Sequence, residues 1–122
     1  MANYVDGFVL VVPKKNLPAY RRMAQKAGKV WLEYGALEFT ECVGDDLTTD
    51  MGIPFPRLAK TKAGEAVVFS WITYKSRKDR DRINAKVMQD PRLEKMMDPK
   101  AAYPFDMKRM SYGGFKVLVA LS

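Results

Sequence analysis

The amino-acid sequence predicts an α+β fold in one domain that spans residues 1–122. We expect an antiparallel sheet that carries both main helices on one face. Four stretches rich in β-branched and aromatic residues indicate strands, and two stretches with apolar residues every three or four positions indicate helices. A chain of 122 residues also suits a single domain.

The first half of the chain is predicted to run strand, helix, strand. Residues 4–12 (YVDGFVLVV) are β-branched and aromatic and stop at a proline, which is typical of a strand. Residues 14–34 carry one apolar helical stripe, and Gly35 suits the position just after a helix. Residues 36–43 alternate and predict a second strand. The helical stripe consists of Leu17, Tyr20, Ala24, Ala27, Trp31 and Tyr34.

A long connection and the clearest strand follow. Residues 44–64 form a link of a length that is uncommon in a compact domain and is often functional or mobile. Residues 65–74 (EAVVFSWITY) are apolar on both faces, which predicts a central strand covered from both sides.

The last third is predicted to hold a helix, a short helix and a strand. Ser76 with an aspartate three residues on resembles a capping box and begins the second main helix. Asp90 followed by proline opens a short helix that ends at Met97. Residues 108–121 form the closing strand, with a bulge or bend expected at its paired glycines.

The predicted order of elements is that of a ferredoxin-like split βαβ fold. Both faces of the strands at 4–12 and 65–74 are apolar, but two helices on one side cover only one face. The other face has to meet something else, and a second copy of the same sheet is the simplest partner. We therefore expect a homodimer formed through the sheet face.

Five segments carry a family resemblance: YVDGFVLVVP, AGKVWLEYGALEFTECVGDD, VVFSWITYKSR, NAKVMQDPR and PFDMKRMSYGGF. They are similar to the YbaA-like bacterial proteins, a family of unknown function in the dimeric α+β-barrel superfamily. The resemblance implies a ferredoxin-like fold and a dimer with sheets packed face to face. It implies no activity and no catalytic residues. Related branches include cofactor-independent monooxygenases and haem-degrading enzymes, the latter typically with a histidine ligand.

The absence of histidine narrows the possible chemistry. The chain has 0 histidines and a single cysteine, which excludes Ser-His-Asp and Cys-His catalysis and histidine-ligated haem. A zinc site would have one soft ligand at most, so the sequence predicts no metal and no cofactor. No internal disulfide can form, no apolar run is long enough for a membrane span, and the first residues do not resemble a signal peptide. These features favour the cytoplasm and no membrane partner.

Five residues are the candidates for a ligand site: Asp6, Trp71, Arg80, Asn84 and Tyr112. Arg80 and Asn84 share the apolar helix face and would line a pocket between helix and sheet, near Trp71 and the 44–64 connection. Asp6 inside a strand would be costly without a cation, for example Arg109. Each has a structural alternative: a snorkelling arginine, a capping asparagine, a core tryptophan, a buried ion pair and an edge-strand tyrosine.

Two classes of function fit these observations. The first is a small-molecule binding protein or a cofactor-independent enzyme, monooxygenase-like by fold analogy alone. The second is a non-catalytic module that binds RNA or an acidic partner through basic helices, since the net charge is +7. Acids are interleaved with the bases on the helices, which does not favour nucleic acid. The sequence leaves open whether the protein is an enzyme.

Overall fold

The computed structural model describes residues 3–98 and 103–122, and within these ranges it contains a four-stranded sheet. The strand order is β2-β3-β1-β4 and every neighbouring pair is antiparallel, which confirms the ferredoxin-like α+β fold. The strands are β1 (Tyr4–Pro13), β2 (Glu38–Val43), β3 (Glu65–Tyr74) and β4 (Ser111–Lys116). The helices are α1 (Leu17–Glu33), α2 (Phe55–Leu58), α3 (Arg77–Met88) and α4 (Pro91–Met96), with 3-10 turns η1 (Lys14–Asn16) and η2 (Met107–Arg109).

Helix ends follow the predicted capping chemistry. The Ser76 hydroxyl accepts a hydrogen bond from the backbone N–H of Asp79 at 3.1 Å, and the Asp90 carboxylate accepts one from the N–H of Arg92 at 2.9 Å. Gly35, at φ 115°, takes the left-handed conformation that ends α1. These local signals place α3 and α4 close to their predicted starts.

The closing strand differs from the prediction. It ends at Lys116 rather than continuing to residue 121, and its glycines pair regularly with β1, as Gly7 with Gly113 and Asp6 with Gly114. No bulge interrupts this pairing, because the glycines leave room for neighbouring side chains rather than bending the strand.

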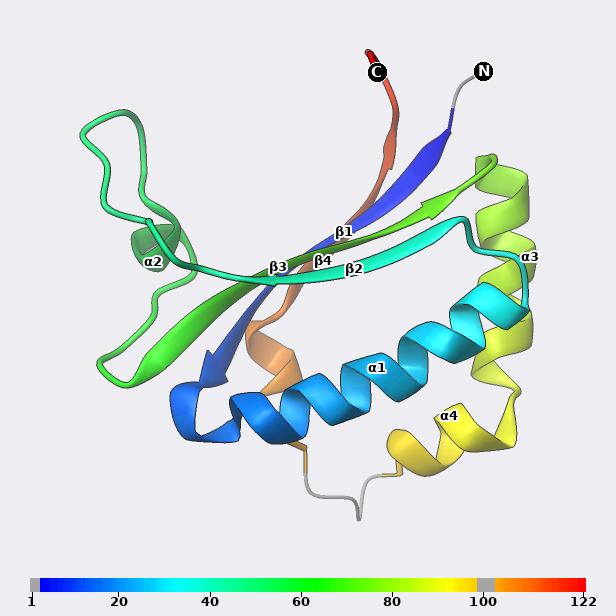
Figure 1. Ribbon diagram of the computed structural model, residues 1–122, viewed down its shortest axis with the longest axis horizontal. Helices are drawn as coiled ribbons and strands as arrows, with labels where there is room; N and C mark the ends of the chain where they lie inside the picture. The colour runs from blue at the N-terminus through cyan, green and yellow to red at the C-terminus, as the bar shows by residue number, and fades with distance from the viewer. Residues whose placement is uncertain (1–2, 99–102) are drawn as a thin grey trace.

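Helices α1, α3 and α4 lie on one face of the sheet, which we call the helix face (Figure 1). Two groups of buried side chains fill the space between the layers. One group lies under α3 and includes Ile72, Tyr74, Ile83 and Val87. The other lies under the first half of α1 and consists of Leu10, Val12, Tyr20, Ala24 and Val68. Side chains at even positions of β1 and β3 point to this face.

The opposite face of the sheet has no helical layer over it (Figure 1). We call it the open face and define it by Val5, Val9, Phe69, Trp71 and Phe115, which share it by strand alternation and register. Phe69 and Phe115 are 46% and 62% exposed. The 44–64 connection, with α2, lies at the end of the sheet away from α3 and holds Phe55 6.2 Å from the ring of Phe69.

None of the helices in the described ranges combines the length and the apolar character that crossing a lipid bilayer requires.

Candidate functional site

The structure brings Asp6, Arg80, Asn84 and Tyr112 together between the sheet and α3. We call these residues, with Tyr4 and Tyr74, the Asp6–Arg80 cluster. Asp6 is 1% exposed because its place in β1 turns its side chain toward α3. Its Oδ1 lies 3.7 Å from Nε of Arg80, and its Oδ2 accepts a hydrogen bond from Nδ2 of Asn84 at 3.4 Å. An arginine of α3, rather than Arg109, therefore neutralises this acid.

The guanidinium of Arg80 is held by a tyrosine as well as by the acid. Its Nη2 donates a hydrogen bond to the Tyr4 hydroxyl at 3.0 Å, and its Cζ lies 4.9 Å from the centre of the Tyr4 ring. Gly114 of β4 pairs with Asp6, and a Cβ at this glycine would fall 2.7 Å from Arg80 Nη2. Glycine at this position is what lets the arginine fit beneath the sheet.

Asn84 connects the cluster to α1. Its Oδ1 accepts hydrogen bonds from Nε1 of Trp31 at 2.9 Å and from the Tyr74 hydroxyl at 3.1 Å. Burial and the nearby charge of Asp6 raise the pKa of Tyr74, so its hydroxyl keeps the proton that it donates. The asparagine thus acts as a junction between α1, α3 and β3 rather than as a cap.

Tyr112 closes the cluster at the β4 edge. Its ring stacks on Phe8 with 4.9 Å between centroids, and burial together with the charge of Asp6 raises its pKa. Asp6 Oδ1 and Arg80 Nε are buried and have no hydrogen-bond partner among the described residues, so they meet by charge alone. The cluster is a polar contact between sheet and α3 that is buried at Asp6 and reaches the surface at Tyr112, which is 50% exposed.

Trp71 does not join this cluster. It pairs with Gly7 and so points to the open face, where its ring lies 5.5 Å from that of Phe69. The prediction that it lines a pocket between helix and sheet is wrong in this geometry, because its neighbours Ser70 and Ile72 hold the helix face. The 44–64 connection is likewise remote from α3 (Figure 1). Arg109 instead bonds Glu65 at 2.6 Å.

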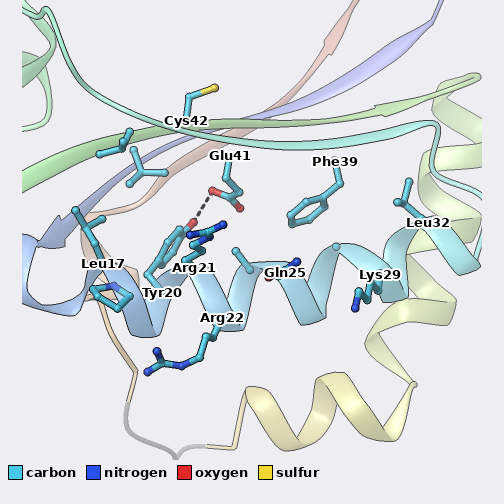
Figure 2. A pocket seen from close by; sticks show the side chains of 15 residues that line it. Leu17, Tyr20, Arg21, Arg22, Gln25, Lys29, Leu32, Phe39, Glu41 and Cys42 are labelled. Carbon is cyan, nitrogen blue, oxygen red and sulfur yellow. Dashed lines mark hydrogen bonds between the residues drawn. The ribbon is translucent and has the colours of Figure 1, made fainter.

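A pocket of about 910 Å³ lies elsewhere on the helix face, between α1 and the edge strand β2 (Figure 2). We call it the α1–β2 pocket. Its apolar wall includes Leu17, Ala24, Leu32, Phe39, Val43 and Val68, and its polar groups include Tyr20, Arg21, Gln25, Lys29 and Glu41. An apolar lining with a few polar groups is typical of small-molecule sites.

The inner polar group of the pocket is a tyrosine–glutamate pair. The Tyr20 hydroxyl donates a hydrogen bond to Oε1 of Glu41 at 2.7 Å, drawn as a dashed line in Figure 2. Burial raises the pKa of Glu41, although hydrogen bonds from Tyr20 and Ser70 act in the opposite direction. Burial and the Glu41 charge also raise the pKa of Tyr20, which therefore stays a donor. The pair offers a ligand one carboxyl group that gains a proton more readily than an exposed glutamate.

Cations lie along the outer side of the pocket. Arg21, Arg22 and Lys29 line it from α1, and Figure 2 shows Arg21 reaching toward β2 while Arg22 and Lys29 point away from the sheet. No ion pair within residues 3–98 and 103–122 involves Arg21. The pocket thus joins an apolar wall to a guanidinium that forms no ion pair in the described part of the chain.

The sequence contained a signal for this second site. Glu41 stands on the same strand face as Leu37, Phe39 and Val43, and an acid among inward apolar residues needs a partner. The helical stripe placed Tyr20 on the facing side of α1. What the sequence did not reveal is the distance between α1 and β2, which decides whether the pair is packed shut or open to a ligand.

Comparisons with known proteins agree with the fold and define the family. Residues 3–107 match the family model described as "Protein of unknown function (DUF1428)". "Uncharacterized protein YbaA" of Escherichia coli (strain K12) is 44% identical over 116 residues, which cover 95% of this chain and 97% of the relative. The YbaA protein of Shigella flexneri matches equally.

Among solved structures, a nipsnap family protein with unknown function from Agrobacterium tumefaciens is similar in fold, with a TM-score of 0.55 and 16% identity. The match covers 94% of this chain and 87% of that one, which supports the ferredoxin-like architecture alone. The family match and the 44% identity go further than the fold. The chain belongs to the YbaA-like DUF1428 family of bacterial proteins, whose function is not established.

Proposed function

We propose that this protein is a homodimeric small-molecule binding protein and that the ligand occupies the α1–β2 pocket. The pocket volume of about 910 Å³ carries the proposal, because sites for small organic ligands span roughly 300–1,000 Å³. The apolar wall supplies contact area, and Glu41, Tyr20 and Arg21 supply the few polar groups that orient a ligand.

The Asp6–Arg80 cluster has a different role in this proposal. Its carboxylate and guanidinium face each other with their closest atoms buried, and the Asp6 side chain is only 2% exposed, so this acid is not available to a molecule from solution. The cluster instead fixes α3 to β1 and keeps the sheet in register beneath the helices. The ligand-binding role predicted for Asp6, Arg80, Asn84 and Tyr112 passes to the residues around Glu41.

Self-association is supported by the open face. Phe69 and Phe115 on this face are 46% and 62% exposed. Each side chain of this kind gains about 1.5–3 kcal/mol when it is fully buried, and helices on the other side cannot supply the cover. Two copies related by a two-fold axis would cover each other's open face.

The binding proposal is tested by titrating the fluorescent probe 8-anilinonaphthalene-1-sulfonate into the protein. We expect one tight site per chain. Val43→Trp, which adds bulk to the pocket wall, should weaken that site at least tenfold. Met88→Trp, at an exposed methionine of α3 outside the pocket, is the matched control and should leave it unchanged. Equal binding by both variants would contradict the proposal.

The dimer is tested by sedimentation velocity over a concentration series. We expect a dimer for the native chain and a monomer for Phe115→Asp, because the charge would be buried in the interface. Phe115 is 62% exposed in one chain, so the substitution leaves the protomer folded. Met88→Asp, on the helix side, should remain a dimer. A native chain that sediments as a monomer at every concentration would contradict the proposed dimer.

Two readings of the sequence remain predictions beside this one. If a cofactor-independent reaction accompanies binding, Glu41 is the candidate base, since it is the acid that lines the α1–β2 pocket. The interaction module would use the exposed bases of α1 and α3. Arg80 is not one of them, because it pairs with Asp6. Salt-sensitive oligonucleotide binding would favour it. We also propose a cytoplasmic location, because Cys42 is a free exposed thiol.

A further inference from the structure

We propose that the ligand of the α1–β2 pocket is an elongated amphipathic anion, with an apolar chain laid along α1 and its negative head group at Arg21. This inference rests on the proposed function and names the chemical class that the pocket takes. A free acyl-chain carboxylate and an anionic membrane lipid share this chemistry, and the experiment below separates them.

The length of the lining favours a chain over a compact molecule. The residues that line the pocket extend along α1 from Leu17 to Leu32. Fifteen residue steps at about 1.5 Å each correspond to roughly 22 Å of helix. On the facing side the lining follows β2 from Phe39 to Val43. A site of this form is a trough beside an edge strand, and its long axis follows the helix.

The base of the trough is apolar where helix and strand come closest. Gly28 of α1 faces Phe39, and a Cβ at Gly28 would lie 2.6 Å from Cδ1 of that ring. The glycine therefore lets α1 approach β2 and brings the Phe39 ring into the pocket wall. Ala24 and Val68 continue this surface, which suits methylene groups rather than polar ones.

The charges of the pocket favour a negative head group. Arg21, Arg22 and Lys29 line it, and the first acid in α1 is Glu33, at the end of the helix. The lining acid Glu41 accepts a hydrogen bond from the Tyr20 hydroxyl, and the three cations of the lining outnumber this one acid. Figure 2 shows Arg21 as the cation directed toward β2, so it is the group that meets the head.

The test measures calorimetric binding of four probes below their micelle-forming concentrations: dodecanoate, octanoate, dodecanol and dodecyltrimethylammonium. We expect one dodecanoate per chain, bound at least tenfold more tightly than dodecanol or the cation of equal chain length. Octanoate is four methylene groups shorter than dodecanoate and should bind roughly a hundredfold more weakly if the chain is buried. Binding of the protein to phosphatidylglycerol vesicles tests the membrane lipid. If the protein binds these vesicles more tightly than it binds free dodecanoate, the site belongs to a lipid surface.

A pair of variants on one helix locates the head group. Arg21→Gln should weaken dodecanoate about tenfold and leave dodecanol unchanged, because it removes charge and keeps the apolar wall. Lys26→Gln is the matched control, since Lys26 is an exposed base of α1 that does not line the pocket. Equal effects of the two variants, or equal affinity for carboxylate and alcohol, would overturn the anionic ligand while the pocket still binds. If Val43→Trp binds the probes as tightly as the native chain does, the proposed function itself is overturned.

Discussion

Nε of Arg80 lies 3.7 Å from Oδ1 of Asp6, and within the described part of the chain neither atom makes a hydrogen bond. The two charges compensate each other at a site where the Asp6 side chain is only 2% exposed and the Arg80 side chain 18% exposed. The contact joins residues that are far apart in sequence and ties the first strand to the second main helix. Its contribution to the fold depends on both partners being present.

Removing either partner should destabilise the protein strongly. We expect Arg80→Met to lower the free energy of unfolding by about 4 kcal/mol and Asp6→Asn by about 3 kcal/mol, since breaking a buried pair costs about 3–5 kcal/mol. Arginine loss costs more because the remaining acid is almost fully buried. Urea denaturation measures both, and the double variant should cost less than the sum.

The control for this pair is Asp81, a second acid beside the same arginine. Its side chain is 60% exposed and lies 3.4 Å from Nε of Arg80. Asp81→Asn should change the free energy of unfolding by less than about 1 kcal/mol, as for exposed pairs in general. If Asp6→Asn costs no more than Asp81→Asn, the buried contact is not what anchors α3.

Gly28→Ala should destabilise the protein although it improves helix propensity. Alanine gains about 1 kcal/mol over glycine in a helix interior, but the new methyl group would meet the Phe39 ring at 2.6 Å. Overpacking of this kind costs about 1–3 kcal/mol, so we expect a net loss of about 1 kcal/mol. Thermal unfolding measures it. Gln25→Ala, at an exposed site of α1, should not lower stability, and a stabilised Gly28→Ala would show that α1 and β2 are not in close contact.

Acid should weaken the protein in part through Glu65. Hydrogen bonds from Arg109 and from the backbone of Lys62 lower the pKa of Glu65 from 4.5 to about 2. A depressed folded-state pKa means that the stabilisation is present above pH 4.5 and is lost as the pH falls toward 2. Glu65→Gln should therefore lose stability at neutral pH and show a flatter decline over that range. Glu38→Gln, at an exposed β2 position, should keep the native decline.

Ligand binding should report on the protonation of Glu41. Burial raises the pKa of this carboxyl, and its charged form repels an anion in the same pocket. Binding of decanesulfonate, which stays ionised in acid, should therefore tighten as the pH is lowered through the Glu41 titration. Glu41→Gln should bind it more tightly at neutral pH with a flatter pH profile. The same pH dependence in Glu41→Gln would mean that another group is responsible.

Much of the fold was predictable because local patterns and the global topology agree. Alternation and helical spacing located the strands and α1, and capping residues placed the starts of α3 and α4. The inward position of Arg80 and Asn84 followed from their spacing to Ile83 and Val87. Asp6 was recognisable as a costly buried acid, but its partner depended on how α3 crosses the sheet and so was not predictable.

The orientation of Trp71 could not be decided from the sequence. Both faces of β3 are apolar, so alternation tells which residues share a face but not which face meets the helices. The α1–β2 pocket was missed for a related reason. It depends on the separation of α1 from the edge strand, which is set by Gly28 against Phe39 and by no periodic pattern.

The alternation of β1 also limits how this protein can change. Val5 and Asp6 are adjacent in the chain, yet one belongs to the open face and the other to the helix face. Point substitutions can therefore accumulate on one side without disturbing the other. A single-residue insertion or deletion early in β1 would instead shift the register of the strand by one residue. That shift would place the acid on the open face and a valine opposite Arg80. We expect the spacing within β1 to tolerate far less variation than its individual side chains.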